Sequence, residues 1–156
     1  LFQSNYSSLI LSACLLGFLP WNYPPAKVFM GDIGSTFLGA YLVSLVYSND
    51  FVNAIFILLI VFPILFDPFV TLLVRIMDGQ KIFSAHKLHL YQRLNEGKLS
   101  NLQVVYIYFL TILINCIVYF YLDSFFLLIS NFIWIAFGIY LNKSFAIPFK
   151  SIQKNL

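Results

Sequence analysis

Long apolar runs separated by short polar segments dominate the chain. Five of these runs can be marked, at about Gln3–Leu19, Gly34–Tyr47, Phe51–Met77, Leu102–Leu122 and Ser124–Leu141. Because about 20 apolar residues in a helix cross the hydrocarbon core of a bilayer, the longer runs can span it. The second run is short, so it must begin below the headgroups or lean on neighbouring segments. The pattern predicts an all-α polytopic integral membrane protein with about five transmembrane helices.

The composition strengthens this prediction. Hydrophobic residues make up 61% of the 156 residues and charged residues only 10%, whereas a soluble domain carries about 25% charged residues. Lipid must therefore cover most of the surface, and we expect no nucleic-acid partner. Cys14 and Cys116 lie far apart, each inside an apolar run, which indicates packing residues rather than metal ligands or a disulfide.

Charge placement predicts the orientation in the membrane. All nine basic residues lie in the segments that follow the first and third runs, at the end of the third run or in the tail: Lys27; Arg75, Lys81, Lys87, Arg93 and Lys98; Lys143, Lys150 and Lys154. The opposite connections, Ser48–Asp50 and Asp123, carry none. By the positive-inside rule, the loops at about 20–33 and 78–101 and the tail 142–156 are cytoplasmic, and the N-terminal end is external. We expect one domain, 1–156, in the inner (plasma) membrane.

The first cytoplasmic loop carries candidate chemistry. Three prolines between Pro20 and Ile33 predict an extended, stiff segment. It ends in Gly-Asp-x-Gly-Ser, residues 31–35, where glycines allow close backbone approach and the next helix presents free N–H groups. The Asp32 carboxylate is a hard ligand suited to Mg²⁺ bound with phosphates. A second interpretation is that Asp32 or Ser35 only caps the helix.

The second cytoplasmic loop contains two histidines and an arginine. If residues 83–94 are helical, His86, His89 and Arg93 share one face, and Leu88, Tyr91 and Leu94 form an apolar side. The cationic face could hold a phosphate. Local chemistry alone favours the other interpretation, an interfacial amphipathic helix against lipid headgroups, because basic helices of this kind are frequent. His-x-x-His without a helical Glu is not a zinc signature.

One acidic residue, Asp67, lies inside the third run between Pro63 and Pro68. An acid at membrane depth is costly unless it faces protein, water or a metal, and the prolines would bend the helix. A functional group and a structural hydrogen bond to a neighbouring span are equally open interpretations.

In order along the chain, these segments resemble the polyprenyl-phosphate N-acetylhexosamine-1-phosphate transferases, glycosyltransferase family 4. The resemblance is most specific in the first loop and weaker at Asp67, Arg75 and the histidine loop. Its motifs are Gly17-Phe18-Leu19, Asn22, Pro25-Ala26-Lys27, Phe29-Met30-Gly31-Asp32-Ile33-Gly34-Ser35 and Leu38-Gly39. The family implies that this chain is the C-terminal half of a fold of about ten or eleven spans.

The resemblance also implies roles. Asp32 corresponds to the acid that binds the active-site Mg²⁺, Phe29 to a residue that stacks on uracil, Asn22 to a uridine-binding side chain, and His89 to a histidine that contacts the diphosphate. We add Lys27, His86 and Arg93 as substrate-binding candidates, and Asp67 as a catalytic candidate with Asp32 and His89. The implied partners are a UDP-N-acetylhexosamine, polyprenyl phosphate and the bilayer.

Two departures from the family pattern matter. Many members have histidines where this chain has Tyr91 and Gln92, a pattern closer to the O-antigen and capsule branch, which leaves the sugar open. The chain also lacks an initiator Met and the family's N-terminal spans with their paired aspartates. We therefore expect the 156 residues alone to be inactive and to need a separate N-terminal half. A homodimer is left open.

The implied reaction is the transfer of a sugar-1-phosphate from a UDP-sugar to the lipid phosphate, with UMP as leaving group. It would be the first membrane step of a cell-envelope polysaccharide, such as the O-antigen of lipopolysaccharide. Two other classes remain. A transporter without chemistry would use the proline-broken spans and Asp67 as a transport path. An inert remnant would be a half-enzyme that folds poorly or works only beside a separate N-terminal half.

Overall fold

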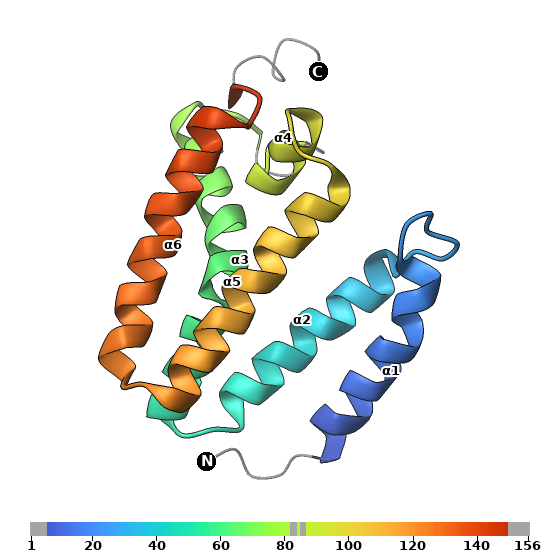
Figure 1. Ribbon diagram of the computed structural model, residues 1–156, viewed down its shortest axis with the longest axis vertical. Helices are drawn as coiled ribbons and strands as arrows, with labels where there is room; N and C mark the ends of the chain where they lie inside the picture. The colour runs from blue at the N-terminus through green and yellow to red at the C-terminus, as the bar shows by residue number, and fades with distance from the viewer. Residues whose placement is uncertain (1–5, 82–83, 85–86, 150–156) are drawn as a thin grey trace. The chain divides into compact units, whose positions relative to one another are not determined.

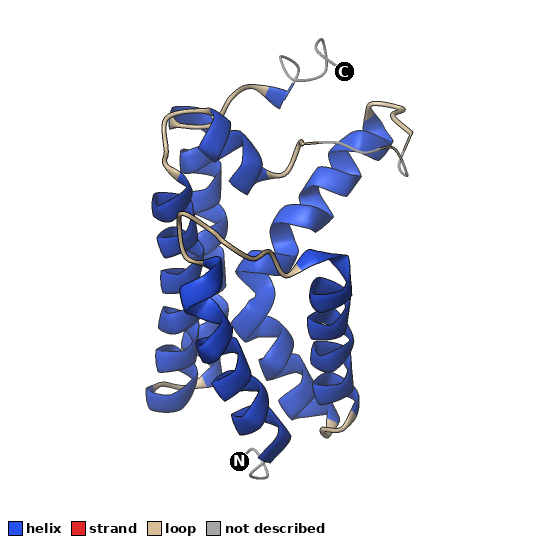
Figure 2. Cartoon of the chain, turned by 90° about the vertical axis from the view of Figure 1, so that its right-hand side faces the viewer, coloured by secondary structure: helices blue, strands red, loops and turns tan. Residues whose placement is uncertain are grey.

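The computed structural model describes residues 6–81, 84 and 87–149, and these residues form helices and loops without a strand (Figures 1 and 2). The helices are α1 (Tyr6–Asn22), α2 (Gly31–Tyr47), α3 (Phe51–Met77), α4 (Leu90–Glu96), α5 (Asn101–Tyr121) and α6 (Ser124–Ser144). The all-α prediction is confirmed. Each of the five apolar runs has become a helix, and α4 is an additional short helix.

Three helices, α3, α5 and α6, are long and apolar enough to cross a membrane. Few of their residues are buried within the protein, so lipid can cover their apolar flanks. At 17 residues, α1 and α2 are each about 26 Å long, slightly less than the hydrocarbon thickness of about 30 Å. Length and composition together describe a multi-pass membrane protein.

The chain divides into two compact units, residues 1–48 and 49–156. In unit 1, α1 and α2 are joined by residues 23–30, and no residue of either helix is buried. A hydrogen bond of 2.6 Å joins the hydroxyls of Ser8 on α1 and Tyr41 on α2. Unit 1 thus leaves both helices open to neighbouring groups along their length.

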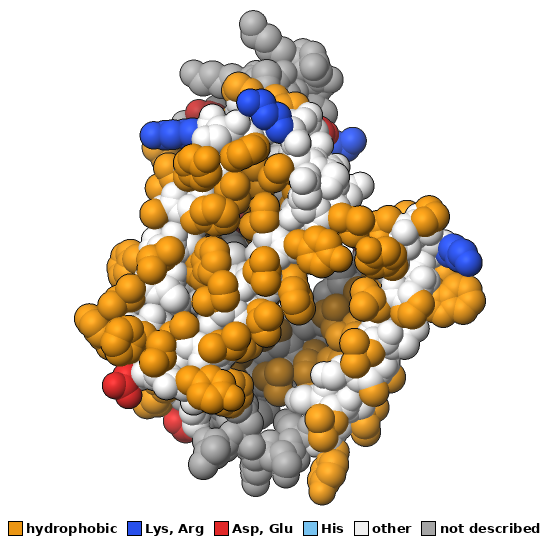
Figure 3. Space-filling view, viewed as in Figure 1, with side chains coloured by type: hydrophobic (Ala, Val, Ile, Leu, Met, Phe, Trp, Pro, Cys, Tyr) orange, Lys and Arg blue, Asp and Glu red, His pale blue; other side chains and the backbone are white. Residues whose placement is uncertain are grey.

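In unit 2, α3, α5 and α6 pack against one another, and α4 contacts all three of them. It lies across the end where α3 and α6 finish and α5 begins (Figure 1). Leu94 of α4, Val104 of α5 and Leu141 of α6 form a buried apolar cluster there. Figure 3 shows apolar side chains along the visible flank of unit 2 and Lys and Arg side chains near its α4 end.

A cluster of buried polar side chains lies deeper in unit 2, next to a carbonyl group that Pro63 leaves without a helical donor. Proline has no N–H to give to the carbonyl four residues earlier, so the Leu59 carbonyl loses its helical donor. The side-chain amides of Asn131 and Asn115 donate to this oxygen at 3.2 and 3.3 Å, and Asn115 is fully buried. Ser130 donates to the Asn115 oxygen at 2.7 Å. Side chains of α5 and α6 therefore satisfy a backbone group of α3 within the membrane-spanning part.

The structure corrects two local predictions. The extended segment predicted between Pro20 and Ile33 is shorter, because α1 continues through Pro20 to Asn22 and α2 already begins at Gly31. A proline near the end of a helix disturbs few backbone bonds, so α1 tolerates it.

The second correction concerns the shared helical face considered for residues 83–94. In the described part of this segment the helix α4 begins at Leu90, and His89 precedes it in an extended conformation, with φ −60° and ψ 148°. The prediction that His89 and Arg93 share one helical face is therefore wrong. His86 lies outside the described residues.

Candidate functional site

Residues 23–30 of unit 1 form a closed loop. The backbone N–H groups of Lys27 and Val28 both donate to the Trp21 carbonyl, at 2.9 and 3.1 Å. The side-chain amide of Asn22 donates to the Val28 carbonyl at 3.1 Å, and the Lys27 ammonium lies 5.8 Å from the centre of the Trp21 ring. Asn22 therefore braces the loop, in addition to the uridine-binding role predicted from the resemblance.

Phe29 is the most prominent side chain of this loop. It is 78% exposed, although burying an aromatic side chain would normally be favourable. An exposed ring on a braced loop is available for stacking, as the sequence-based hypothesis requires.

Asp32 lies in the first turn of α2, and its side chain is exposed. The N-cap residue of α2 is Met30, which makes no side-chain cap hydrogen bond, and the Ser35 hydroxyl donates to the Asp32 carbonyl. Neither Asp32 nor Ser35 occupies the cap position, so the interpretation as a helix cap is wrong. The carboxylate stays available to an incoming group.

Two glycines shape the turn before this carboxylate. Gly31 has φ +65°, a backbone conformation that costs an L-residue with a side chain. A Cβ at Gly34 would meet the Met30 side chain. Gly31 therefore meets a backbone requirement just before Asp32, and Gly34 leaves room for the Met30 side chain.

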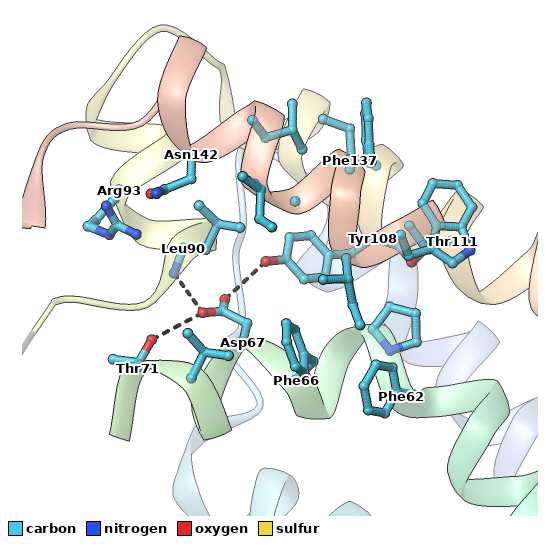
Figure 4. Close-up of a pocket in the computed structure, with 18 residues that line it drawn as sticks. Phe62, Phe66, Asp67, Thr71, Leu90, Arg93, Tyr108, Thr111, Phe137 and Asn142 are labelled. Carbon is cyan, nitrogen blue, oxygen red and sulfur yellow. Dashed lines mark hydrogen bonds between the residues drawn. The ribbon is translucent and has the colours of Figure 1, made fainter. Parts of the chain in front are cut away.

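In unit 2, Asp67 on α3 is only 8% exposed and accepts several hydrogen bonds. The backbone N–H groups of Leu90 and Tyr91, at the start of α4, donate to it at 2.7 and 3.2 Å. The hydroxyls of Tyr108 on α5 and Thr71 donate at 3.0 and 3.3 Å. Figure 4 shows Leu90, Thr71 and Tyr108 converging on the carboxylate. The structural interpretation of Asp67, a hydrogen bond to a neighbouring span, is therefore observed.

His89 lies beside this carboxylate, with 3.9 Å between its Nδ1 and an Asp67 oxygen. Its ring stacks on Tyr91, with ring centroids 5.7 Å apart and planes inclined by 13°. The Gln92 side chain accepts the His89 backbone N–H at 3.3 Å. The two residues that depart from the family pattern, Tyr91 and Gln92, thus both contact His89.

The two arginines near this end are buried and bind backbone carbonyls. Arg93 donates to the carbonyls of Leu88 and Ile147, at 3.1 and 3.0 Å, and lies over the Phe149 ring. Burial lowers the pKa of the Arg93 guanidinium, and the negative charge of Asp67 partly opposes this shift. Arg93 therefore holds α4 to the segment after α6. The prediction that Arg93 binds phosphate did not include this contact.

A cavity of about 170 Å³ lies between α3, α5, α6 and α4. Its wall is mainly apolar and aromatic, with Asp67, Arg93 and Tyr108 at the polar end (Figure 4). The structure brings Asp67, His89 and Arg93 together in unit 2. It places Asn22, Lys27, Phe29 and Asp32 together in unit 1.

Sequence reasoning missed Tyr108 and Thr71. Thr71 follows Asp67 by four residues, a spacing that places it on the same helical face and could have been noticed. Tyr108 is one of ten tyrosines in a chain rich in aromatics, and nothing in its surroundings distinguished it.

Comparisons with known proteins agree with the resemblance. Residues 2–50 match the family model for Glycosyl transferase family 4. The chain is 37% identical over 109 residues to a probable undecaprenyl-phosphate N-acetylglucosaminyl 1-phosphate transferase of Bacillus subtilis, covering 66% of this chain and 30% of that protein. It is 32% identical over 117 residues to a phospho-N-acetylmuramoyl-pentapeptide-transferase of Alkaliphilus metalliredigens, covering 72% and 34%.

A shorter stretch of 44 residues is 54% identical to an undecaprenyl-phosphate alpha-N-acetylglucosaminyl 1-phosphate transferase of Thermotoga maritima, covering 25% of this chain and 15% of that protein. The chain spans about a third or less of the length of these relatives. No solved structure matches it. The resemblance to family 4 glycosyl transferases is confirmed.

Proposed function

We propose that this chain is part of a family 4 glycosyl transferase that transfers an N-acetylhexosamine-1-phosphate from a UDP-sugar to a polyprenyl phosphate and releases UMP. The observation that carries the proposal is the segment matched to the family, residues 2–50, which contains an exposed Asp32 beside an exposed Phe29. The relatives' names supply the sugar-1-phosphate and the polyprenyl acceptor.

Mg²⁺ is the proposed cofactor, and Asp32 fits it as a single ligand. No group of three or more His, Cys, Asp or Glu side chains able to hold a metal ion occurs in the described part of the chain. Mg²⁺ does not need one, since it commonly binds through one or two carboxylates together with substrate phosphates and water. When bound, it would neutralise the charge that develops on the transferring phosphate.

The chain's own residues would bind and orient the sugar nucleotide. Phe29 would stack on the uracil ring, and Lys27 would attract the diphosphate. His89, held beside Asp67, would donate to a phosphate oxygen. Phosphoryl transfer depends mainly on positioning and charge stabilisation, so side chains on braced loops suit it.

The sugar and the place of the reaction are also proposals. Relatives named for N-acetylglucosamine make UDP-N-acetylglucosamine the first donor to test. The O-antigen branch suggested by Tyr91 and Gln92 makes 6-deoxy N-acetylhexosamines the second. We place the protein in the plasma membrane, with both site-bearing loops on the cytoplasmic side, where nucleotide sugars are available.

The test is UMP release in lipid nanodiscs, with undecaprenyl phosphate and a panel of UDP-N-acetylhexosamines that includes UDP-N-acetylmuramoyl-pentapeptide. One arm contains the 156-residue chain alone. The other contains it with an N-terminal half that carries the family's paired aspartates. We expect release only in the second arm, only with the lipid acceptor, and its loss with a chelator.

Failure of the complete protein to release UMP from any donor would overturn the proposed function. Release by the chain alone would contradict the need for a second half, and would mean that Asp67 or a second copy supplies further ligands.

A further inference from the structure

We infer that Asp67 and Arg75 of α3 form a clamp on the described parts of the α3–α4 connection, with Arg75 at residues 80, 81 and 84 and Asp67 at the start of α4, and that this clamp positions His89. At one end of the clamp the Arg75 cation donates to backbone carbonyls, and at the other end the Asp67 carboxylate accepts backbone N–H groups. It rests on the proposed function only for the consequence that His89 contacts substrate.

The first end of the connection is held by Arg75, which is 2% exposed. Its guanidinium donates to the carbonyl of Lys81, and to the Ser84 hydroxyl at 2.9 Å. Its Nε donates to the Gln80 side chain at 3.3 Å. Arginine suits this place because its planar fork of donors can engage several acceptors at once.

The second end is held by Asp67, two helical turns before Arg75 on the same helix. It accepts the first two backbone N–H groups of α4, Leu90 and Tyr91. These N–H groups have no acceptor within the helix, and a negative charge there is favourable. Because Asp67 is on α3, it determines where α4 begins and so where the preceding residue, His89, lies.

Asp67 and Arg75 are not a pair of charges exposed to solvent. The two side chains are almost fully buried, and a buried charge is retained only where its hydrogen bonds are satisfied. Here the partners of the two charges lie mostly in the connection and at the start of α4, before and after His89 in the sequence. Asp67 is thus a positioning residue. This role explains why an acid is present in a membrane span although it does not act on the reacting atoms.

The clamp predicts faster hydrogen exchange at specific amides. In the complete protein in nanodiscs, Asp67→Ala should speed exchange of the Leu90 and Tyr91 amides by about tenfold or more, since hydrogen bonds to a charged group are lost. Arg75→Gln should speed exchange in peptides that cover residues 78–89. Exchange within α5 and α6 should change little. Lys81→Ala is the matched control, because Arg75 binds the carbonyl of that residue and not its side chain.

The kinetic readout separates positioning from general stability. Asp67→Asn and Arg75→Gln should lower kcat by about 10²-fold, the usual effect of an ångström-scale misplacement, with KM for the UDP-sugar changed much less. Asp67→Glu should recover part of kcat, because a carboxylate remains. Lys81→Ala and Asp50→Asn, a change at the opposite end of α3, should keep wild-type kcat.

The outcomes distinguish the clamp from the proposed function. Unchanged exchange at Leu90 and Tyr91 in Asp67→Ala would overturn the clamp. Faster exchange with wild-type kcat would overturn the positioning role. A complete wild-type protein without transferase activity would end the proposed function, while the exchange data would still support or overturn the clamp by themselves.

Discussion

In unit 1 the candidate side chains face outward, whereas in unit 2 the charged side chains turn inward onto backbone groups. Phe29, in the loop braced by Asn22, and Asp32, just after this loop, are both exposed. Asp67 and Arg93, in contrast, are buried and bind N–H and carbonyl groups of neighbouring segments. The same residue types therefore serve different purposes, and exposure distinguishes a group available to substrate from a group that holds the fold.

The largest change to this comparison would come if the loop after α1 and the loop after α3 lay on opposite sides of the membrane. A reporter fused after Gly97 or after Lys154 should be cytoplasmic, and one inserted at Asn49 external, because the basic residues lie in the last turns of α3 and α6 and in the segments that follow α1, α3 and α6. Cysteine-accessibility labelling at the same positions checks the reporter. An external location for Gly97 would remove His89 from the side proposed for the sugar nucleotide.

A buried polar group in unit 2 should matter for stability. Asn131→Leu removes a donor from the Leu59 carbonyl, which has no helical donor because of Pro63. We expect a loss of about 1–3 kcal/mol in the free energy of unfolding, nearer the low end because membrane hydrogen bonds are often weak. Thermal unfolding in nanodiscs measures it. Asn142→Leu, at an exposed position of the same helix, should change little, and equal effects would refute a special role for Asn131.

An exposed residue of unit 1 should affect substrate binding instead. Phe29→Ala should raise KM for the UDP-sugar by up to about tenfold, since an aromatic pair is worth about 0.5–1.5 kcal/mol. Phe29→Tyr should retain the wild-type KM, because the ring remains. The control Tyr47→Ala changes an exposed aromatic residue at the other end of α2. An unchanged KM in Phe29→Ala would mean that this ring does not contact the uracil.

The fold could be predicted wherever the signal was local. The bounds of α3, Phe51–Met77, are those predicted from the apolar run, because a long and predominantly apolar stretch has no better alternative than a spanning helix. The start of α4 could not be predicted, since its first N–H group bonds to Asp67, 23 residues before Leu90. The hydrogen bond of Tyr108 could not be predicted for the same reason, because its partner Asp67 is far away in the sequence.

The site shows a similar division. The sequence identified Asp32, Phe29 and His89 as candidates, and their predicted roles remain predictions. It could not tell that Arg93 is turned toward the carbonyls of Leu88 and Ile147, because a basic residue on a short helix looks the same whether it faces lipid headgroups, a phosphate or the backbone.

The most direct test of the account compares two exposed aspartates at helix starts, Asp32 of α2 and Asp50 of α3. In the complete protein, Asp32→Asn should lower UMP release by about 10²-fold or more, because the charge that would hold Mg²⁺ is lost. Its melting temperature should stay that of the wild type, and Asp50→Asn should keep full activity. Near-normal turnover in Asp32→Asn would contradict the account.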